Sequence, residues 1–231
     1  MIGILGGMGT QAGLDFCNKL AKLNKGKTDQ QYPLFILYNK SDIPGRPENL
    51  LRYNIVLKSL VAGWKFLEKS KCKFIVIPCN TAHYWFNDLQ KKTKIPIISM
   101  PKEVYAHSIK TCKKNSKIGL LATEGTIKTG VYNKFFDKKF KLINPTKTVQ
   151  KNNVNKAIKL VKMGRIKEAE KAVRPAVNSL VKMKCSKIIL GCTELPIAIF
   201  AFKSFQKIKK SKTFLDPNLI LAHSSMRKYK E

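Results

Sequence analysis

The chain contains a sequence unit that occurs twice, and this internal repeat constrains its fold more than any other feature. Three segments recur in the same order in both halves, with one cysteine at the same place in each copy. The pairs are Ile2-Gly3-Ile4-Leu5-Gly6-Gly7-Met8-Gly9-Thr10 with Ile118-Gly119-Leu120-Leu121-Ala122-Thr123-Glu124-Gly125-Thr126, Phe74-Ile75-Val76-Ile77-Pro78-Cys79-Asn80-Thr81 with Lys187-Ile188-Ile189-Leu190-Gly191-Cys192-Thr193-Glu194, and Ala106-His107-Ser108 after Pro101 with Ala222-His223-Ser224 after Pro217. Three matches in register predict two similar domains related by a pseudo-twofold axis.

Short apolar runs alternate with longer, lysine-rich stretches of helical periodicity. The runs end at Leu5, Leu37, Ile77, Ile98, Leu121 and Leu190. This alternation predicts the α/β class, as two pseudo-symmetric three-layer α/β domains with mostly parallel sheets. We expect a first domain over residues 1–100, with the segment 213–231 packing back on it, and a second over residues 101–212. In such an arrangement the active site lies in the interdomain cleft.

The formal net charge of +31 ordinarily suggests nucleic acid as a partner. The basic residues are nearly all lysine, however, and they are spread along every expected helix. Arginine occurs only at positions 46, 52, 165, 174 and 227. We therefore interpret the lysines as solvated helix faces and expect no specific nucleic acid as partner. A non-catalytic basic binding protein stays open as an alternative.

The six cysteines form no C-x-x-C pair, and the three histidines are scattered, so we expect neither a zinc site nor a disulfide framework. No apolar run approaches the roughly 18 residues that span a bilayer, and the start lacks the pattern of a signal peptide. The sequence therefore predicts a cytoplasmic protein that does not interact with membranes.

The segment Gly6-Gly7-Met8-Gly9 follows an apolar strand and precedes a helical stretch. Gly7-x-Gly9-x-x-Ala12 satisfies a loose dinucleotide fingerprint, with Asp29 near the place of a ribose-binding acid. The equivalent loop in the second half does not repeat it, and a nucleotide site leaves the paired cysteine loops unexplained. A nucleotide-linked oxidoreductase is therefore an alternative, and binding of NAD is its test.

Cys79 and Cys192 each end an apolar strand and open a polar turn, where open α/β sheets build their sites. A helix N-terminus at such a turn lowers the pKa of a thiol and binds anions. Asn80, Thr81 and Thr193 are placed to hold a carboxylate there. Taken singly, each cysteine is explained as well by burial at the end of a strand. Two at equivalent positions favour chemistry on opposite faces of one carbon.

These motifs resemble the aspartate/glutamate racemase family, which is independent of pyridoxal phosphate, over essentially the whole chain. The residues that carry the resemblance to its aspartate racemase branch are Gly6-Gly7-Met8-Gly9, Cys79-Asn80-Thr81-Ala82-His83, Leu121-Ala122-Thr123-x-Gly125-Thr126 and Gly191-Cys192-Thr193-Glu194. Glutamate racemases instead carry Asp-Ser-Gly in the first loop and a histidine after the second Cys-Thr. Thr10 and Gly13 depart from the proline and threonine that are usual at their places.

The resemblance implies roles for further residues. Arg46 in Ile43-Pro44-Gly45-Arg46 and Lys162 in Val161-Lys162-Met163-Gly164 would bind the side-chain carboxylate of the substrate, although in so basic a chain either is also explained as a surface cation. Met8 would line the pocket. The remaining candidates are chosen by their residue types and places rather than by the resemblance: Thr123 to contact the substrate or cap a helix, and Glu194 to tune the Cys192 thiol, hold the substrate ammonium or cap a helix. We expect His83 to orient the first helical turn rather than to act as a base.

The sequence as a whole predicts a cofactor-independent racemase of an acidic amino acid, with aspartate first, in which Cys79 and Cys192 are the two bases. By resemblance Cys79 serves the D face and Cys192 the L face, and the protein is a homodimer. Two related alternatives stay open, a broad-specificity aspartate/glutamate racemase and a cysteine-dependent dicarboxylate isomerase or decarboxylase.

Overall fold

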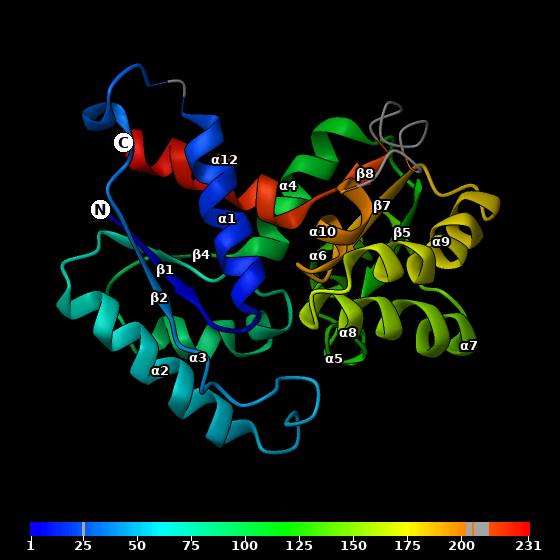
Figure 1. Cartoon of the computed structure of the whole chain (residues 1–231), viewed down its shortest axis with the longest axis horizontal. Helices are drawn as coiled ribbons and strands as arrows, with labels where there is room; N and C mark the ends of the chain where they lie inside the picture. The colour runs from blue at the N-terminus through cyan, green and yellow to red at the C-terminus, as the bar shows by residue number, and fades with distance from the viewer. Residues whose placement is uncertain (25, 202–204, 206–212) are drawn as a thin grey trace. The chain divides into compact units, whose positions relative to one another are not determined.

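The computed structural model describes residues 1–24, 26–201, 205 and 213–231 (Figure 1). The chain folds as two compact units, the first formed by Met1–Glu103 and Asn218–Glu231 and the second by Val104–Pro217. The chain passes from the first unit to the second within the helix Met100–Thr111, and it returns to the first unit at the start of the helix Pro217–Lys230.

A four-stranded parallel sheet forms the centre of the first unit, with strand order β2-β1-β3-β4. The strands are β1 (Ile2–Gly6), β2 (Phe35–Asn39), β3 (Phe74–Val76) and β4 (Ile97–Ile98). The helices are α1 (Thr10–Leu23), α2 (Tyr53–Lys69), α3 (Phe86–Lys91), α4 (Met100–Thr111), whose first residues belong here, α12 (Pro217–Lys230), and the 3-10 turns Asp29–Gln31 and Thr81–Trp85.

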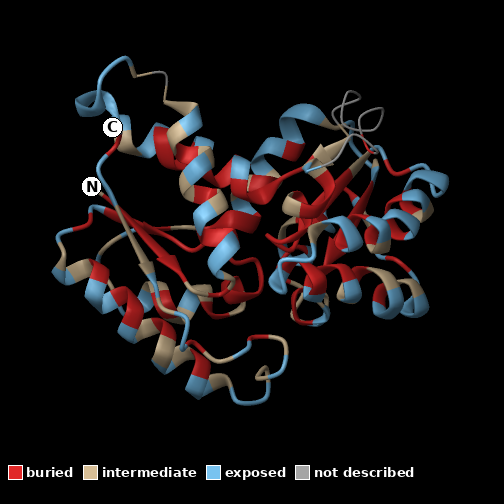
Figure 2. Cartoon of the chain, in the orientation of Figure 1, coloured by how far each residue is buried: buried red, intermediate tan, exposed pale blue. Residues whose placement is uncertain are grey.

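Helices cover both faces of this first sheet. Ile4 packs with Phe16 of α1 and Leu221 of α12 on one face, whereas Leu5 packs with Leu60 of α2 on the other. Because successive strand residues point to opposite faces, β1 must be apolar along its whole length. All five of its residues are buried (Figure 2). The unit therefore has the three layers that the sequence predicts.

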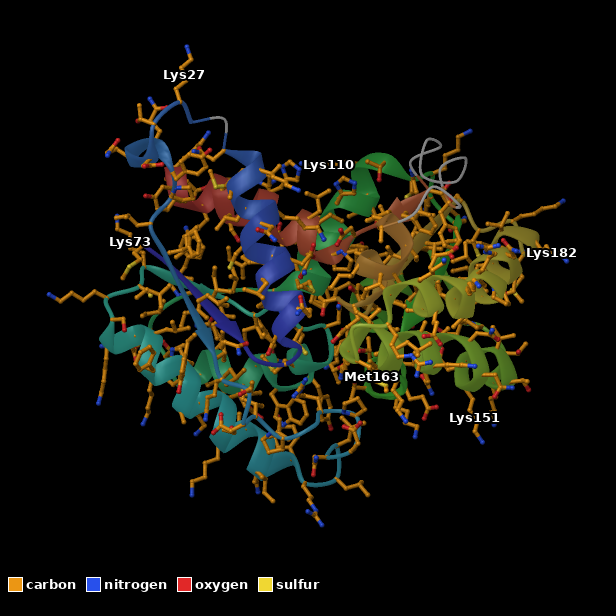
Figure 3. The ribbon with its side chains drawn as sticks, in the orientation of Figure 1. Lys27, Lys73, Lys110, Lys151, Met163 and Lys182 are labelled. Atoms are coloured by element: carbon orange, nitrogen blue, oxygen red, sulfur yellow. The ribbon has the colours of Figure 1, made fainter. Side chains whose placement is uncertain are left out.

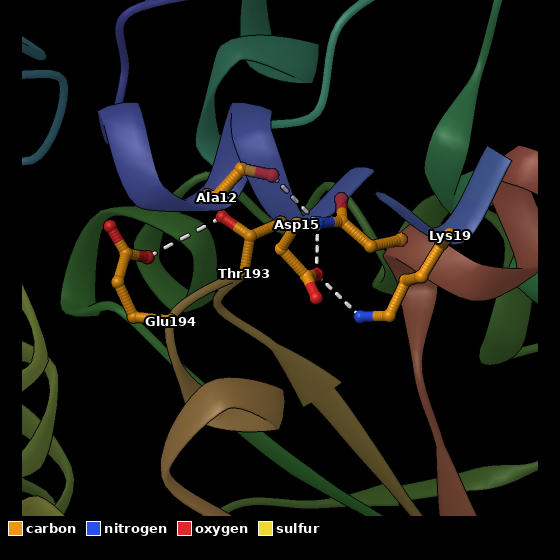
Figure 4. Close-up of polar contacts among 6 residues, drawn as sticks. Ala12, Asp15, Lys19, Thr193 and Glu194 are labelled. Atoms are coloured by element: carbon orange, nitrogen blue, oxygen red, sulfur yellow. Dashed lines mark hydrogen bonds and ion pairs between the residues drawn. The ribbon is translucent and has the colours of Figure 1, made fainter. Parts of the chain in front are cut away.

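Polar contacts fasten the C-terminal helix to the N-terminal helix of the first unit. Asn218, at the start of α12, donates hydrogen bonds to the carbonyl of Ala12 (3.1 Å) and to Oδ2 of Asp15 (3.0 Å). Asp15 is also paired with Lys19 one turn further along α1 (Figure 4). These bonds explain how the last residues of the chain complete a unit that begins at its first residue.

The second unit repeats this architecture, with a parallel sheet of strand order β6-β5-β7-β8. Its strands are β5 (Lys117–Ala122), β6 (Lys141–Ile143), β7 (Lys187–Gly191) and β8 (Phe214–Leu215). Its helices are α5 (Glu124–Lys128), α6 (Asn133–Phe136), α7 (Lys147–Val149), the π-helical turn Gln150–Asn155, α8 (Lys156–Lys162), α9 (Ile166–Lys182) and α10 (Leu195–Phe200). Leu121 and Leu190 pack under α8, α9 and α10. An aromatic group that includes Tyr132, Phe136 and Phe140 forms a further buried cluster.

The two sheets confirm the α/β fold with two similar domains. β1 and β5 occupy the second place in their sheets, and β3 and β7 occupy the third. One expectation is wrong: β8 pairs with β7 in the second sheet, so Phe214–Leu215 does not pack on the first domain. Two residues are enough to complete a sheet edge, but too few to give a pattern in the sequence. The expected boundary after residue 212 lies outside the described residues.

The glycine-rich loop after β1 is shaped by a close approach of the backbone. Gly7 has a φ of 86°, and a Cβ there would lie 2.1 Å from the carbonyl oxygen of Lys40, in the segment after β2. Only glycine fits both the positive φ and the contact. The glycine at this place is therefore explained by packing against Lys40, without a nucleotide.

The lysines labelled in Figure 3 are exposed and extend from several elements of both units; they are Lys27, Lys73, Lys110, Lys151 and Lys182. Among the described residues, no helix combines the length and the apolar character that crossing a membrane requires.

Candidate functional site

In the first unit the candidate residues lie in the loops that follow the carboxyl ends of its strands. Met8 follows β1, Arg46 follows β2, and Cys79 follows β3. Because parallel strands end at the same edge of a sheet, these loops belong to one edge. All three side chains are buried, as are Asn80 and Thr81. The candidate residues of this unit that the sequence indicated are therefore buried and lie in loops at one edge of the sheet.

Arg46 is held by main-chain carbonyls. Its guanidinium donates hydrogen bonds to the carbonyls of Met8 (2.7 Å), Pro44 (3.1 Å) and Ile43 (3.3 Å). The side chain is 6% exposed, and its Nε has no acceptor in the part of the chain that the structure describes. Among the described residues, no carboxylate lies within ion-pair distance of it. A buried cation without a counter-ion is costly, so Arg46 provides a site at which an anion is favoured.

His83 fixes the loop that carries Cys79. Its Nδ1 lies 2.9 Å from the carbonyl of Cys79, and its Nε2 lies 3.0 Å from the amide nitrogen of Met100, which can only donate. His83 is therefore the neutral Nδ1–H tautomer. Burial lowers the pKa of His83 to about 4, which agrees with this state. The two hydrogen bonds agree with the expectation that His83 orients this turn or bonds to its neighbours.

The turns after the two cysteines are shorter than the sequence suggests. Cys79 is followed by the 3-10 turn Thr81–Trp85, and Cys192 by the six-residue helix α10. Short helices have a weak dipole effect, so the environment of each thiol depends mainly on its immediate neighbours. These neighbours differ between the two units.

In the second unit, Cys192 is bound to a buried carboxylate. Its thiol donates a hydrogen bond to Oε2 of Glu194 (2.9 Å). The hydroxyl of Thr193 donates to the same oxygen (3.4 Å), as Figure 4 shows. Burial raises the pKa of Cys192 well above its usual range, and the charge and hydrogen bond of Glu194 raise it further. The backbone N–H of Glu194 and the charge of Lys162 oppose this shift. Cys192 is therefore a protonated thiol in this structure.

Glu194 stands at the N-cap position of α10, but its side chain contacts the thiol instead of the helix. Its side chain makes no capping hydrogen bond to α10, so the capping alternative is wrong. The carboxylate is 3% exposed, and its Oε1 has no hydrogen-bond partner among the described residues.

The two remaining candidates of the second unit are Lys162, which is exposed, and Thr123, which has a structural role. Lys162 is an exposed residue at the end of α8, and its charge still reaches Cys192. Thr123 is the N-cap of α5: its hydroxyl accepts from the amide of Thr126 (3.1 Å) and donates to the Thr126 hydroxyl (3.1 Å). Thr123 therefore matches the capping alternative that the sequence left open.

Comparison with known proteins identifies the family. The pattern of the family described as Asp/Glu/Hydantoin racemase matches residues 5–224, nearly the whole chain. The chain belongs to this family. Its α/β fold and its match to racemases make the protein an isomerase, and the resemblance found in the sequence is confirmed.

Individual relatives of this racemase extend the comparison. The broad-specificity amino-acid racemase RacX of Bacillus subtilis (strain 168) is 25% identical over 99% of this chain and 98% of its own length. A glutamate racemase of Carboxydothermus hydrogenoformans is 29% identical over 72% of this chain and 60% of its own length. The solved aspartate racemase of Picrophilus torridus superposes with a TM-score of 0.84, at 27% identity, over 99% of this chain and 94% of its own. The protein is thus an amino-acid racemase, and its relatives carry three different substrate descriptions.

Sequence reasoning missed Tyr132, which interacts with the second thiol of this racemase, and Asp216, which interacts with Tyr132. Tyr132 is fully buried; burial raises its pKa well above the usual range, and the negative charge of Asp216 and that of Cys192 in its ionised form raise it further. Asp216, which follows β8, is also buried. The folding of distant segments brings Tyr132 to Cys192 and Asp216 to Tyr132. No signal in a single sequence could have identified them.

Gln150 is a third residue that the sequence did not indicate. It begins the π-helical turn and is 6% exposed. Its amide donates to the carbonyl of Ala122 (2.9 Å) and to Oδ1 of Asn155 (2.8 Å). Ala122 is paired in register with Gly191, the residue before Cys192. Gln150 therefore supports the end of the strand that neighbours the cysteine loop.

Proposed function

We propose that this racemase interconverts L- and D-aspartate by moving the Cα proton between two cysteine side chains, Cys79 and Cys192. The observation that carries the proposal is the equivalence of the two thiols. Each is buried, and each follows the third strand in the order of its sheet. A reaction that removes a proton from one face of a carbon and delivers one to the other face needs two such groups.

In the proposed reaction, one cysteine as thiolate forms an S–H bond with the Cα proton. The electron pair of the broken C–H bond is held on the α-carboxylate as an enediolate. It returns to Cα when the other cysteine, as thiol, gives its proton to the opposite face. The roles reverse for the other enantiomer, and following the family resemblance Cys79 serves the D face and Cys192 the L face. Because each thiol changes charge in every turnover, the pair titrates as a coupled unit.

The reaction as proposed uses no pyridoxal phosphate, so the protein itself has to stabilise the enediolate. Buried hydrogen-bond donors act strongly on such a charge because little water competes with them. Asn80, Thr81 and Thr193 are the side chains that we propose for this role, since each adjoins a cysteine and is buried. The backbone N–H of Glu194, which already favours the charged form of Cys192, acts in the same sense.

A second carboxylate distinguishes aspartate from neutral amino acids, and Arg46 is the residue that we propose for binding it. Its burial, its unpaired charge and the free Nε–H support this role. Lys162 would add attraction from a distance, as an exposed charge that also acts on Cys192. The similarity to the Picrophilus torridus aspartate racemase supports the same substrate.

Proton NMR of L-aspartate with the purified protein in D2O, without added cofactor, tests the proposal. We expect deuterium to enter Cα while D-aspartate appears on a chiral column. Cys79→Ala and Cys192→Ala should each abolish racemisation, and each should still exchange the Cα proton of the one enantiomer that the remaining thiol serves. Cys112→Ala, which removes a thiol outside both cysteine loops, is the matched control and should retain activity. Full racemase activity in both single variants would sink the two-thiol mechanism.

The similarity to RacX favours a second candidate function, a racemase of broad specificity. The same exchange measurement with glutamate, alanine and lysine beside aspartate separates the two functions. Rates within about tenfold of one another across this panel would favour broad specificity. Exchange of aspartate alone would favour the first proposal.

A further inference from the structure

The two carboxylate oxygens of Glu194 have different environments. Oε2 accepts hydrogen bonds from the Cys192 thiol and the Thr193 hydroxyl, whereas Oε1 accepts none from the residues that the structure describes. The side chain is 3% exposed, so solvent has almost no access to it. A buried carboxylate oxygen without a donor is unfavourable, which indicates that a donor outside this chain completes it.

The surroundings of Glu194 indicate the charge of that donor. The titratable groups that act on Cys192, besides Glu194, are Tyr132, in the segment after α5, and Lys162 at the end of α8, and Asp216 after β8 acts in turn on Tyr132. Tyr132, Asp216 and Glu194 are neutral or negative and buried, whereas Lys162 is exposed. The buried carboxylates thus supply acceptors and negative charge, and a cationic donor complements both.

We propose that Oε1 of Glu194 accepts the α-ammonium group of the substrate, and that this contact selects amino acids over carboxylic acids without an amino group. The inference rests on the proposed function and adds the recognition of the third charged group of the substrate. It also distinguishes a racemase from an enzyme that acts on simple dicarboxylates, because only an amino acid carries the ammonium.

The same contact links recognition to the chemistry of the thiol. The Glu194 carboxylate disfavours a thiolate at Cys192. An ammonium group on Oε1 offsets this negative charge, so Cys192 loses its proton more easily when an amino acid is bound than when the site holds an acid without an amino group.

Calorimetric binding of L-aspartate and of succinate, which lacks only the amino group, tests the proposal without requiring turnover. For the unmodified protein we expect tighter binding of aspartate. Glu194→Gln keeps the shape of the side chain and removes its charge. It should weaken the binding of aspartate about tenfold or more, while the affinity for succinate changes by no more than about twofold. Glu168→Gln, the same change at an exposed position of α9, should alter neither affinity.

Three results overturn the proposal. They are equal weakening of aspartate and succinate in Glu194→Gln, unchanged aspartate affinity in that variant, and no preference for aspartate over succinate in the unmodified protein. Far-UV circular dichroism and the thermal unfolding midpoint verify that the Glu194→Gln variant is folded. If the unmodified protein prefers aspartate to succinate without racemising it, and Glu194→Gln removes that preference, the proposed reaction is rejected while the ammonium site stands, so the two failures are distinguishable.

Discussion

The Cys192 thiol donates a hydrogen bond to Oε2 of Glu194 over 2.9 Å, which ties one of two equivalent cysteines to a buried carboxylate. In the other half of the repeat, Thr81 stands two residues after Cys79, at the place that Glu194 occupies after Cys192. The two strands are equivalent but the charges beside the two thiols are not. A racemase with this asymmetry has one thiol that is strongly protonated before the substrate arrives.

Removing the Glu194 charge should make Cys192 more reactive. Glu194→Gln lowers the pKa of Cys192 toward its usual value, although burial still holds it above that value. We expect iodoacetamide to modify Cys192 about tenfold faster in the variant at about pH 8, because only the thiolate reacts. Peptide mass spectrometry measures this rate, with Glu168→Gln as the control. A slower or unchanged rate would show that the carboxylate does not hold the thiol protonated.

Buried His83 should make the stability of the protein depend on pH. Its pKa is about 4 in the folded protein, while an unfolded histidine titrates near 6.5. The unfolded state therefore binds the proton first, so stability from this residue is fully present above about pH 6.5 and is lost as the pH falls toward about 4. The full shift corresponds to about 3 kcal/mol.

Urea unfolding at several pH values between about 7 and 4 measures this loss. His83→Gln, which removes the titrating group, should show a shallower dependence than the unmodified protein. His223→Gln is the matched control at an exposed histidine and should leave the dependence unchanged. The same slope in all three proteins would mean that His83 is protonated without cost in the folded state.

Much of the fold could be predicted because its central strands are long and apolar. β1, β5 and β7 are buried on both faces and gave continuous apolar runs. β6 and β8 were not predicted: they are edge strands of three and two residues, and their apolar runs are shorter than residues 95–98, the run that indicated the two-residue β4. The domain assignment of β8 was wrong for the same reason.

Only those residues of the candidate site that belong to the internal repeat or to a recognisable motif could be predicted from the sequence. Cys79 and Cys192 are visible in the sequence because they are equivalent. The hydrogen bond between Arg46 and Met8 joins residues that are far apart in the chain, and the charge interaction of Tyr132 with Cys192 arises from packing alone. Such contacts depend on tertiary structure, so spacing in one sequence does not reveal them.

The glycine-rich loop after β1 should tolerate no side chain at Gly7. Gly7→Ala has to adopt a positive φ and places Cβ against the Lys40 carbonyl. Gly164, with a φ of 75°, has nothing within 4 Å of its Cβ position, so Gly164→Ala isolates the backbone cost of about 1 kcal/mol. We expect Gly7→Ala to lose clearly more free energy of unfolding, about 3 kcal/mol or more, in urea titrations. Equal losses would show that the loop moves away from Lys40 without cost.

Replacement of Arg46 should affect substrates according to their charge. Arg46→Ala removes a buried cation that has no carboxylate partner among the described residues, so binding of aspartate should weaken about tenfold or more while binding of alanine changes little. The variant also loses the hydrogen bond to Met8, which affects the loop for both ligands alike. The ratio of the two dissociation constants therefore isolates the charge.

Calorimetry of L-aspartate and L-alanine with Arg46→Ala and with Arg52→Ala, an exposed arginine a few residues further on, measures that ratio. We expect Arg52→Ala to leave it unchanged. If Arg46→Ala weakens aspartate and alanine by the same factor, the guanidinium serves only to fasten the glycine-rich loop. The second carboxylate of the substrate would then have to be bound by another cation, and because Lys162 is exposed and its charge still reaches Cys192, Lys162→Ala would be the variant that decides its role.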